Sequence, residues 1–194
     1  MNTRFRKYNN LMNELQEEQR VGQRLQQINT FFNKFRYKRE ITDYWKCRPE
    51  FLDDGYGDCD DFAISKYFSL LKLNINWDKL KIAYANIIIN DIKEAHMVIL
   101  YQHSKKLTLI LDNYDLKIHR LDNRKNLEIV FTFNNKFLYF KGVEYENHME
   151  KWIAVEKREQ ENIIRINDNQ QEELLPPSQG PRQNKDNTRL SPDI

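Results

Sequence analysis

The spacing of apolar residues changes near Asn74, and this change constrains the fold more than any other feature of the chain. Before Asn74, apolar residues recur at helical spacings and predict helices over residues 8–35 and 60–73. After it, β-branched and aromatic segments predict strands over residues 80–89, 95–101, 107–111, 128–133 and 137–140, and residues 152–155 are a candidate for a last strand. Helices followed by sequential strands predict an α+β fold, with the N-terminal helices packed on an antiparallel sheet.

Three further local signals refine this outline. Pro49, Gly55 and Gly57 predict a loop between the two helices. Asn74 is expected to end the second helix, because asparagine tolerates the left-handed conformation that terminates many helices. Successive apolar residues, as in the run 87–89, indicate a sheet that is covered on both faces.

The 194 residues suit one domain, which we expect to span residues 1–160. Four of the five prolines lie in the segment 166–194, among Gln, Asn, Asp and Lys. Such a segment cannot bury enough apolar surface to offset its ordering entropy. It therefore predicts a disordered tail.

The charge is balanced, because 31 basic residues face 29 acidic ones. This balance does not favour a nucleic-acid partner, and we interpret the local basic run 34–39 as a solvated helix end rather than a phosphate-binding patch. No apolar run is long enough to predict direct membrane insertion. The N-terminus shows no secretory signal, which leaves open a cytoplasmic protein or a leader outside this sequence.

The most informative stretch of the sequence is Gly-Tyr-Gly-Asp-Cys-Asp-Asp-Phe-Ala, residues 55–63. Its two glycines lead into Cys59 at the start of a predicted helix. A helix N-terminus carries a partial positive charge and free N–H groups, and both favour the thiolate over the thiol. The acidic neighbours make Cys59 a poor core residue. Cys59 is thus a candidate nucleophile.

His96 is the best candidate for the base that a thiolate needs, because among the four histidines it lies inside a predicted strand. If the following hairpin turns at Ser104, His96 and Asp112 lie eight residues on either side of the turn. They are then direct cross-strand neighbours, with Cβ atoms about 5 Å apart. Asp112 could orient the imidazole as the third member of a triad, or it could simply end its strand as a turn former.

The carboxylates around Cys59 allow two interpretations. Asp58 and Asp60 offer hard oxygen ligands to a cation such as calcium, although their spacing is not that of an EF-hand. Alternatively, Asp58 caps the helix and Asp60, with Asp61, complements its dipole without any metal. Without a cation, like charges disfavour the Cys59 thiolate.

Four blocks of this sequence, in order, resemble the bacterial transglutaminase-like cysteine proteinases. The likeness covers roughly residues 20–155. The blocks are Ile-Asn-Thr-Phe-Phe-Asn at 28–33, the segment 43–52 followed by Gly-Asp-Cys-Asp-Asp-Phe-Ala-Ile-Ser-Lys-Tyr-Phe-Ser-Leu at 57–70, Ala-His-Met-Val at 95–98 and Leu-Asp-Asn at 111–113.

The resemblance implies a papain- or transglutaminase-like fold and a triad of Cys59, His96 and Asp112. It also implies a calcium-dependent endopeptidase, with the ion bound by Asp58 and Asp60. The family usually has glutamate where this chain has the shorter Asp60. Members are periplasmic and release cells from biofilms by cutting a large surface adhesin near its N-terminus, within a di-alanine site. An inner-membrane receptor that senses cyclic di-GMP sequesters them.

Two other functions fit the same fold: a transglutaminase-like acyltransferase, and a non-catalytic protein-binding module. An intact set of three triad residue types favours an enzyme over the binding module. Trp45 is a candidate for lining the site. Cys47 could form an inactivating disulfide with Cys59 in an oxidising compartment.

Overall fold

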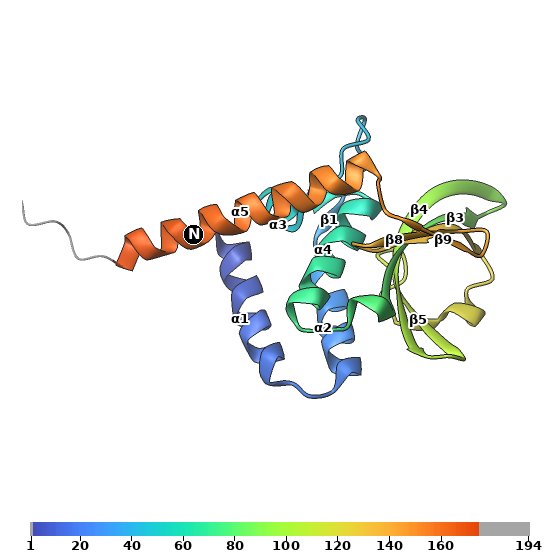
Figure 1. Cartoon of the computed structure of the whole chain (residues 1–194), viewed down its shortest axis with the longest axis horizontal. Coiled ribbons are helices and arrows are strands. Elements are labelled where there is room, and N and C mark those ends of the chain that lie inside the picture. The colour runs from blue at the N-terminus through green and yellow to red at the C-terminus, as the bar shows by residue number, and fades with distance from the viewer. Residues whose placement is uncertain (1, 175–194) are drawn as a thin grey trace, which may run out of the picture.

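The computed structural model describes residues 2–174, and Figure 1 shows a helical layer that lies to one side of a sheet. The described residues form five α-helices: α1 (Thr3–Glu17), α2 (Val21–Phe32), α3 (Arg48–Asp54), α4 (Cys59–Lys72) and α5 (Glu150–Leu174). There are also two short 3-10 turns: η1 (Trp77–Lys79), which leads from α4 into the sheet, and η2 (Leu121–Asn123), which joins two strands. None of these helices is both long and apolar enough to cross a bilayer.

The sheet has seven strands, and every neighbouring pair in it is antiparallel. Its spatial order is β6 (His119–Arg120), β5 (Leu107–Leu111), β4 (Ile92–Ser104), β3 (Leu80–Ile89), β7 (Leu127–Phe133), β8 (Phe137–Phe140) and β9 (Val143–Glu146). The five predicted strands are all present, whereas the short edge strands β6 and β9 were not predicted. A separate parallel pair joins β1 (Arg36–Tyr37) to β2 (Tyr56–Gly57).

Two clusters of buried hydrophobic residues lie on opposite faces of the central strands. On β3, Ile82 belongs to the larger cluster, which also contains the buried residues of the helices, while Ala83 and Ala85 belong to the smaller one. This alternation follows from the period of two in a strand. Leu121 of η2 packs against the smaller cluster. Both faces are therefore covered, as the apolar runs predicted, but the second cover comes from the segment around η2 rather than from helices.

Three sequence-based element predictions are wrong. The expected helix 8–35 is two helices, because the chain is extended at Glu18, whose carboxylate accepts the N–H of Arg20 at 2.8 Å. The expected loop after Pro49 contains α3, since proline is tolerated in the first turn of a helix. The candidate strand 152–155 lies in α5, where burial recurs with helical spacing at Trp152, Val155 and Glu159.

The end of α4 follows the prediction. Asn74 adopts a φ of 59° just beyond the helix. The N–H of Asn74 donates to Leu71 O at 2.9 Å and that of Ile75 to Leu70 O at 3.1 Å. This pair of bonds is a Schellman motif. It turns the chain from the helical layer into the sheet.

Helix α5 continues past residue 166, where we expected a disordered tail to begin, as far as Leu174. The end of this stretch, Gln-Gln-Glu-Glu-Leu at 170–174, consists of good helix formers. The remainder of the predicted tail, 175–194, lies outside the described residues.

A buried ion pair fastens α5 to α3. Nη2 of Arg48 lies 2.6 Å from Oε1 of Glu159, and the backbone N–H of Arg48 donates to Oε2 of Glu159 at 2.9 Å. Each side chain is 5% exposed. Nη1 of Arg48 also donates to the hydroxyl of Tyr8 in α1 at 2.5 Å. Three helices that are distant in sequence are thus joined at one point.

We expect Glu159→Ala to lower the free energy of unfolding by about 3–5 kcal/mol, because it leaves the guanidinium of Arg48 buried without a counter-ion. Urea denaturation measures the change. Glu161→Ala is the matched control on the same helix, since Glu161 is 56% exposed and its partner Lys157 is 3.9 Å away. The control should change stability by less than about 0.5 kcal/mol. Equal effects of the two variants would show that the buried pair contributes no more than a surface charge.

Candidate active site

Cys59 is the first residue of α4 and lies at a cavity of about 730 Å³. His96 of β4 and the acidic residues Asp58 and Asp60 line the same cavity. Sequence-distant aromatic residues complete the wall: Tyr37, Trp45, Tyr84 and Phe131. Trp45 both lines the cavity and packs, because its ring stacks on Phe133 with centroids 5.9 Å apart.

The structure brings His96 and Asp112 together, although not through the register we expected. Nε2 of His96 lies 2.8 Å from Oδ1 of Asp112. The pairing of β4 with β5 is Ile99 with Leu111, which is shifted by two residues from a turn centred on Ser104. The chain turns between Ser104 and Leu107, so the centre of the turn lies one residue later than we expected. A further register shift in β4 lies between Gln102 and Ser104. A shift of two keeps the side chains on the same face, so the two residues meet as diagonal neighbours.

Asp112 is buried and held by several donors. Its Oδ1 also accepts the N–H of Tyr114 at 2.9 Å, and its Oδ2 lies 2.8 Å from Nη1 of Arg124. Burial by itself raises the pKa of Asp112, but the hydrogen bond and charge of His96, with the Arg124 charge, bring it down to about 2. Asp112 is therefore an anion. A role as a turn former at the end of its strand does not by itself account for the contacts with His96 and Arg124.

Two basic residues near Asp112 were missed by sequence reasoning. Arg124 is 8% exposed and reaches Asp112 from the loop after η2. Lys66 of α4 is 1% exposed, and burial lowers its pKa to about 7, while the negative charge of Asp112 acts in the opposite direction. Arg124 belongs to no motif, so no local signal in the sequence could have found it, whereas Lys66 lies inside the block 57–70 that carries the family resemblance but was given no role there.

The Cys59 thiol lies in a conflicting electrostatic environment. Burial first, and then the charges of Asp60 and Asp58, raise the pKa of Cys59 to about 12. The backbone N–H groups of Met97 and of Cys59 itself act in the opposite direction. The effect of the helix terminus is thus outweighed by burial and like charge. The chain by itself holds this group as a thiol.

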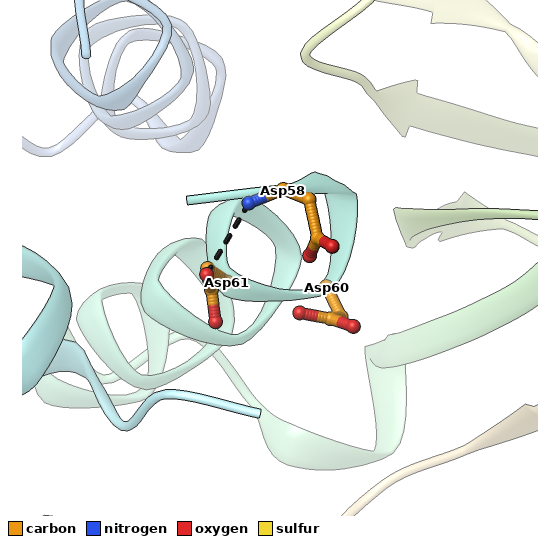
Figure 2. A group of neighbouring side chains, drawn as sticks. All are labelled: Asp58, Asp60 and Asp61. Atoms are coloured by element: carbon orange, nitrogen blue, oxygen red, sulfur yellow. Dashed lines mark hydrogen bonds between the residues drawn. The ribbon is translucent and has the colours of Figure 1, made fainter. Parts of the chain in front are cut away.

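Asp58, Asp60 and Asp61 form a cluster in which one oxygen of each lies within 4.8 Å of the others (Figure 2). Burial and the two neighbouring carboxylates raise the pKa of Asp60 to about 10. Burial also raises the pKa of Asp61, to about 7, against the opposing effect of Lys46. One buried oxygen each of Asp58 and Asp60 has no hydrogen-bond partner in this part of the chain.

Asp61 differs from its two neighbours, because both of its oxygens are engaged. Its Oδ1 accepts the N–H of Lys46 at 2.8 Å, and its Oδ2 accepts the N–H of Asp58 at 3.3 Å. Asp61 therefore fixes the start of α4, whereas the capping interpretation gave that role to Asp58, which is the N-cap residue. The unpartnered oxygens of Asp58 and Asp60 are the atoms of this cluster that could hold a cation, and carboxylate oxygens suit calcium.

Cys47 and Cys59 are both free thiols, so the disulfide that we considered is not formed. Cys47 is fully buried at the start of α3. Its backbone N–H donates to Oε2 of Glu50 at 2.8 Å. Cys47 thus packs in the core and is the N-cap residue of α3.

The fold is that of the transglutaminase-like cysteine proteinases. The chain belongs to the bacterial transglutaminase-like cysteine proteinase family, whose sequence profile matches residues 3–160. This confirms both the family resemblance and the α+β fold predicted from the sequence. No curated protein sequence matches the chain significantly.

Solved structures of LapG from Legionella pneumophila are similar to this chain. The calcium-bound form is 36% identical, with a TM-score of 0.73, and the alignment covers 80% of this chain and 88% of that one. An EGTA-treated form is 35% identical over 80% of this chain and 88% of that one, with a TM-score of 0.75. A third LapG structure is 36% identical over 80% and 86%, also with a TM-score of 0.75. Calcium binding is thus a property of that relative.

We expect Gly57→Ala to distort the start of α4, because an added Cβ would lie 2.1 Å from Oδ2 of Asp61 and 2.8 Å from its Cβ. The expected loss in the free energy of unfolding is about 1–3 kcal/mol. The matched control is Gly22→Ala in α2, where nothing lies within 4 Å of an added Cβ. Since alanine favours helix over glycine, the control should stabilise by up to about 1 kcal/mol. Chemical denaturation of both variants tests this, and an unchanged Gly57→Ala protein would contradict it.

Proposed function

We propose that this chain is a calcium-dependent cysteine endopeptidase in which Cys59 is the nucleophile, His96 the general base and acid, and Asp112 the residue that orients His96. The observation that supports this most is the hydrogen bond of 2.8 Å between Nε2 of His96 and Oδ1 of Asp112, beside a cavity that His96 shares with Cys59. With Nε2 engaged, Nδ1 is the ring nitrogen that remains to exchange a proton.

The proposed reaction proceeds in two steps. Cys59 sulfur attacks the scissile carbonyl while its proton passes to His96, and His96 then gives that proton to the leaving amine. Water hydrolyses the resulting thioester, and His96 takes the proton of the water and returns it to the sulfur. Asp112 stays ionised and stabilises the imidazolium, which its low pKa supports. Backbone N–H groups at the start of α4 are suited to stabilise the oxyanion.

Asp58 and Asp60 are the proposed calcium ligands. Their unpartnered buried oxygens and mutual repulsion suit a divalent cation. When bound, calcium supplies positive charge that offsets the effect of both carboxylates on the neighbouring thiol. Asp60 is shorter than glutamate by one methylene, but its place in the cluster keeps it within reach of Asp58.

We further propose the biological setting that the family resemblance implies. The substrate is a large surface adhesin, cut near its N-terminus within a di-alanine site, and its cleavage controls biofilm attachment. The protease then acts in the periplasm, where an inner-membrane receptor for cyclic di-GMP sequesters it. The calcium-bound LapG structure of a relative at 36% identity supports the calcium part of this proposal.

Incubation of the purified protein with an N-terminal adhesin fragment from the same organism tests the activity. We expect a single cut that Cys59→Ala abolishes and that Asp112→Asn slows by roughly 10⁴-fold, because the imidazole loses its orienting anion. His103→Ala, a change at an exposed histidine of the same strand, should retain activity. Mass spectrometry of the products separates the alternatives. A product with an added amine would indicate an acyltransferase, and an uncut fragment bound by folded protein would favour a binding module.

The calcium proposal predicts a pH-dependent thermal shift. Because the folded chain raises the pKa of Asp60 to about 10 and of Asp61 to about 7, it holds protons that the unfolded chain releases, so stability falls as pH rises above about 4. Calcium removes this penalty, and at a hundredfold excess over its Kd stabilises by about 2.7 kcal/mol. Its effect on Tm should therefore be larger near pH 8 than near pH 5.

Asp60→Asn provides the matching variant for the calcium measurement. We expect it to exceed the wild type in Tm when a chelator is present, and to respond less to calcium. Asp78→Asn, at an exposed aspartate far from the cluster, is the control and should behave like the wild type. A calcium shift that Asp60→Asn leaves unchanged would place the ion elsewhere.

A further inference from the structure

A second cavity, of about 530 Å³, lies on the helical layer and is rich in cationic side chains. Arg4 and Lys7 of α1, Lys34, and Arg36 of β1 line it, and the aromatic rings of Phe31 and Phe35 contribute its apolar lining. None of the residues that line it is acidic. It is distinct from the cavity that holds Cys59, since the two share no lining residue.

The cations of this second cavity are not neutralised locally. Within residues 2–165, no carboxylate lies within ion-pair distance of Arg4, Lys7, Lys34 or Arg36. Arg4 is held in place by the carbonyl of Leu52, whose oxygen accepts its Nε–H at 2.7 Å. The chain as a whole is nearly neutral, so this concentration of one charge is local. Such a cavity is complementary to carboxylates attached to apolar groups.

The basic run 34–39 connects this cavity to the candidate active site. Lys34, Phe35 and Arg36 line the basic cavity, whereas Tyr37 and Arg39 line the cavity of Cys59. Our interpretation of this run as a solvated helix end is therefore incomplete. Positions 34 and 39 are five residue steps apart, which is at most about 16 Å at strand spacing. Neighbouring stretches of one short segment therefore line the two cavities.

We propose that the basic cavity is an exosite that binds an acidic segment of the protein substrate. This inference rests on the proposed peptidase function and names the chemistry of a second substrate contact. Glutamate or aspartate side chains of the segment pair with Lys7, Lys34 and Arg36, and an aromatic or aliphatic side chain packs on Phe31 and Phe35. The volume is within the range of cavities that accept a few such side chains.

The first test measures binding without catalysis. A fluorescein-labelled peptide with the repeat Glu-Glu-Phe is titrated with the full chain carrying Cys59→Ala, and fluorescence anisotropy is recorded. We expect Lys7→Glu or Lys34→Glu to weaken binding roughly tenfold or more, because each reverses one charge in the cavity. Lys38→Glu is the matched control, since Lys38 lies in the same run but lines neither cavity. A Gln-Gln-Phe peptide should not bind measurably. A control variant that weakens binding equally would overturn the assignment of the site.

The second test measures cleavage of the adhesin fragment and of a short reporter peptide that spans only the scissile bond. We expect Lys34→Glu to raise KM for the fragment roughly tenfold, with little change in kcat or in reporter cleavage. Binding of the acidic peptide with an unchanged KM would show that the substrate is not the occupant. Absence of peptide binding, with normal cleavage, would refute the exosite and leave the peptidase in place. Peptide binding by a wild-type chain that cleaves neither substrate would refute the peptidase and the substrate assignment together.

Discussion

The buried carboxylate of Asp61 holds the start of α4, and the arrangement of the site depends on it. Asp61 is fully buried, receives the N–H of Lys46 from one side and that of Asp58 from the other, and lies against Gly57, where a side chain would collide with it. A helix that is fixed at its first turn in this way presents its first residue, Cys59, in one place. The same turn places Asp58 and Asp60 directly before and after Cys59 in the chain, and brings an oxygen of each carboxylate within 4.8 Å of the other.

The two carboxylate environments of the site have opposite electrostatic consequences. Asp112 lies among donors and cations, and its pKa falls although it is buried. Asp60 lies among other carboxylates, and its pKa rises to about 10. The difference follows from the neighbours and not from burial, which acts in the same direction on both. The first environment suits a permanent anion that orients an imidazole. The second favours either protonation or a bound cation, and this links the state of the Cys59 thiol to an ion that the proposed function requires.

The segment between α2 and α3 gives the molecule two adjoining cavities. Its strand β1 pairs in parallel with β2, which ends one residue before Asp58. Residues before and within β1 line the basic cavity, and residues from Tyr37 onward line the catalytic one. A single short ribbon thus lies between the residues that line the two cavities. This arrangement supports an extended recognition surface around the candidate peptidase site.

The sequence by itself determined the features that depend on near neighbours. The strands, the stop at Asn74 and the place of Cys59 at a helix start follow from periodicity and local turn chemistry. His96 and Asp112 share a face despite the wrong register, because an even shift preserves the alternation of side chains. Only the tertiary structure decided that Arg124 would pair with Asp112, that Lys46 would hold Asp61, and that α5 would dock on α3 through Glu159. Those contacts join segments whose approach is set by packing of the whole domain, and no pattern of neighbouring residues encodes it.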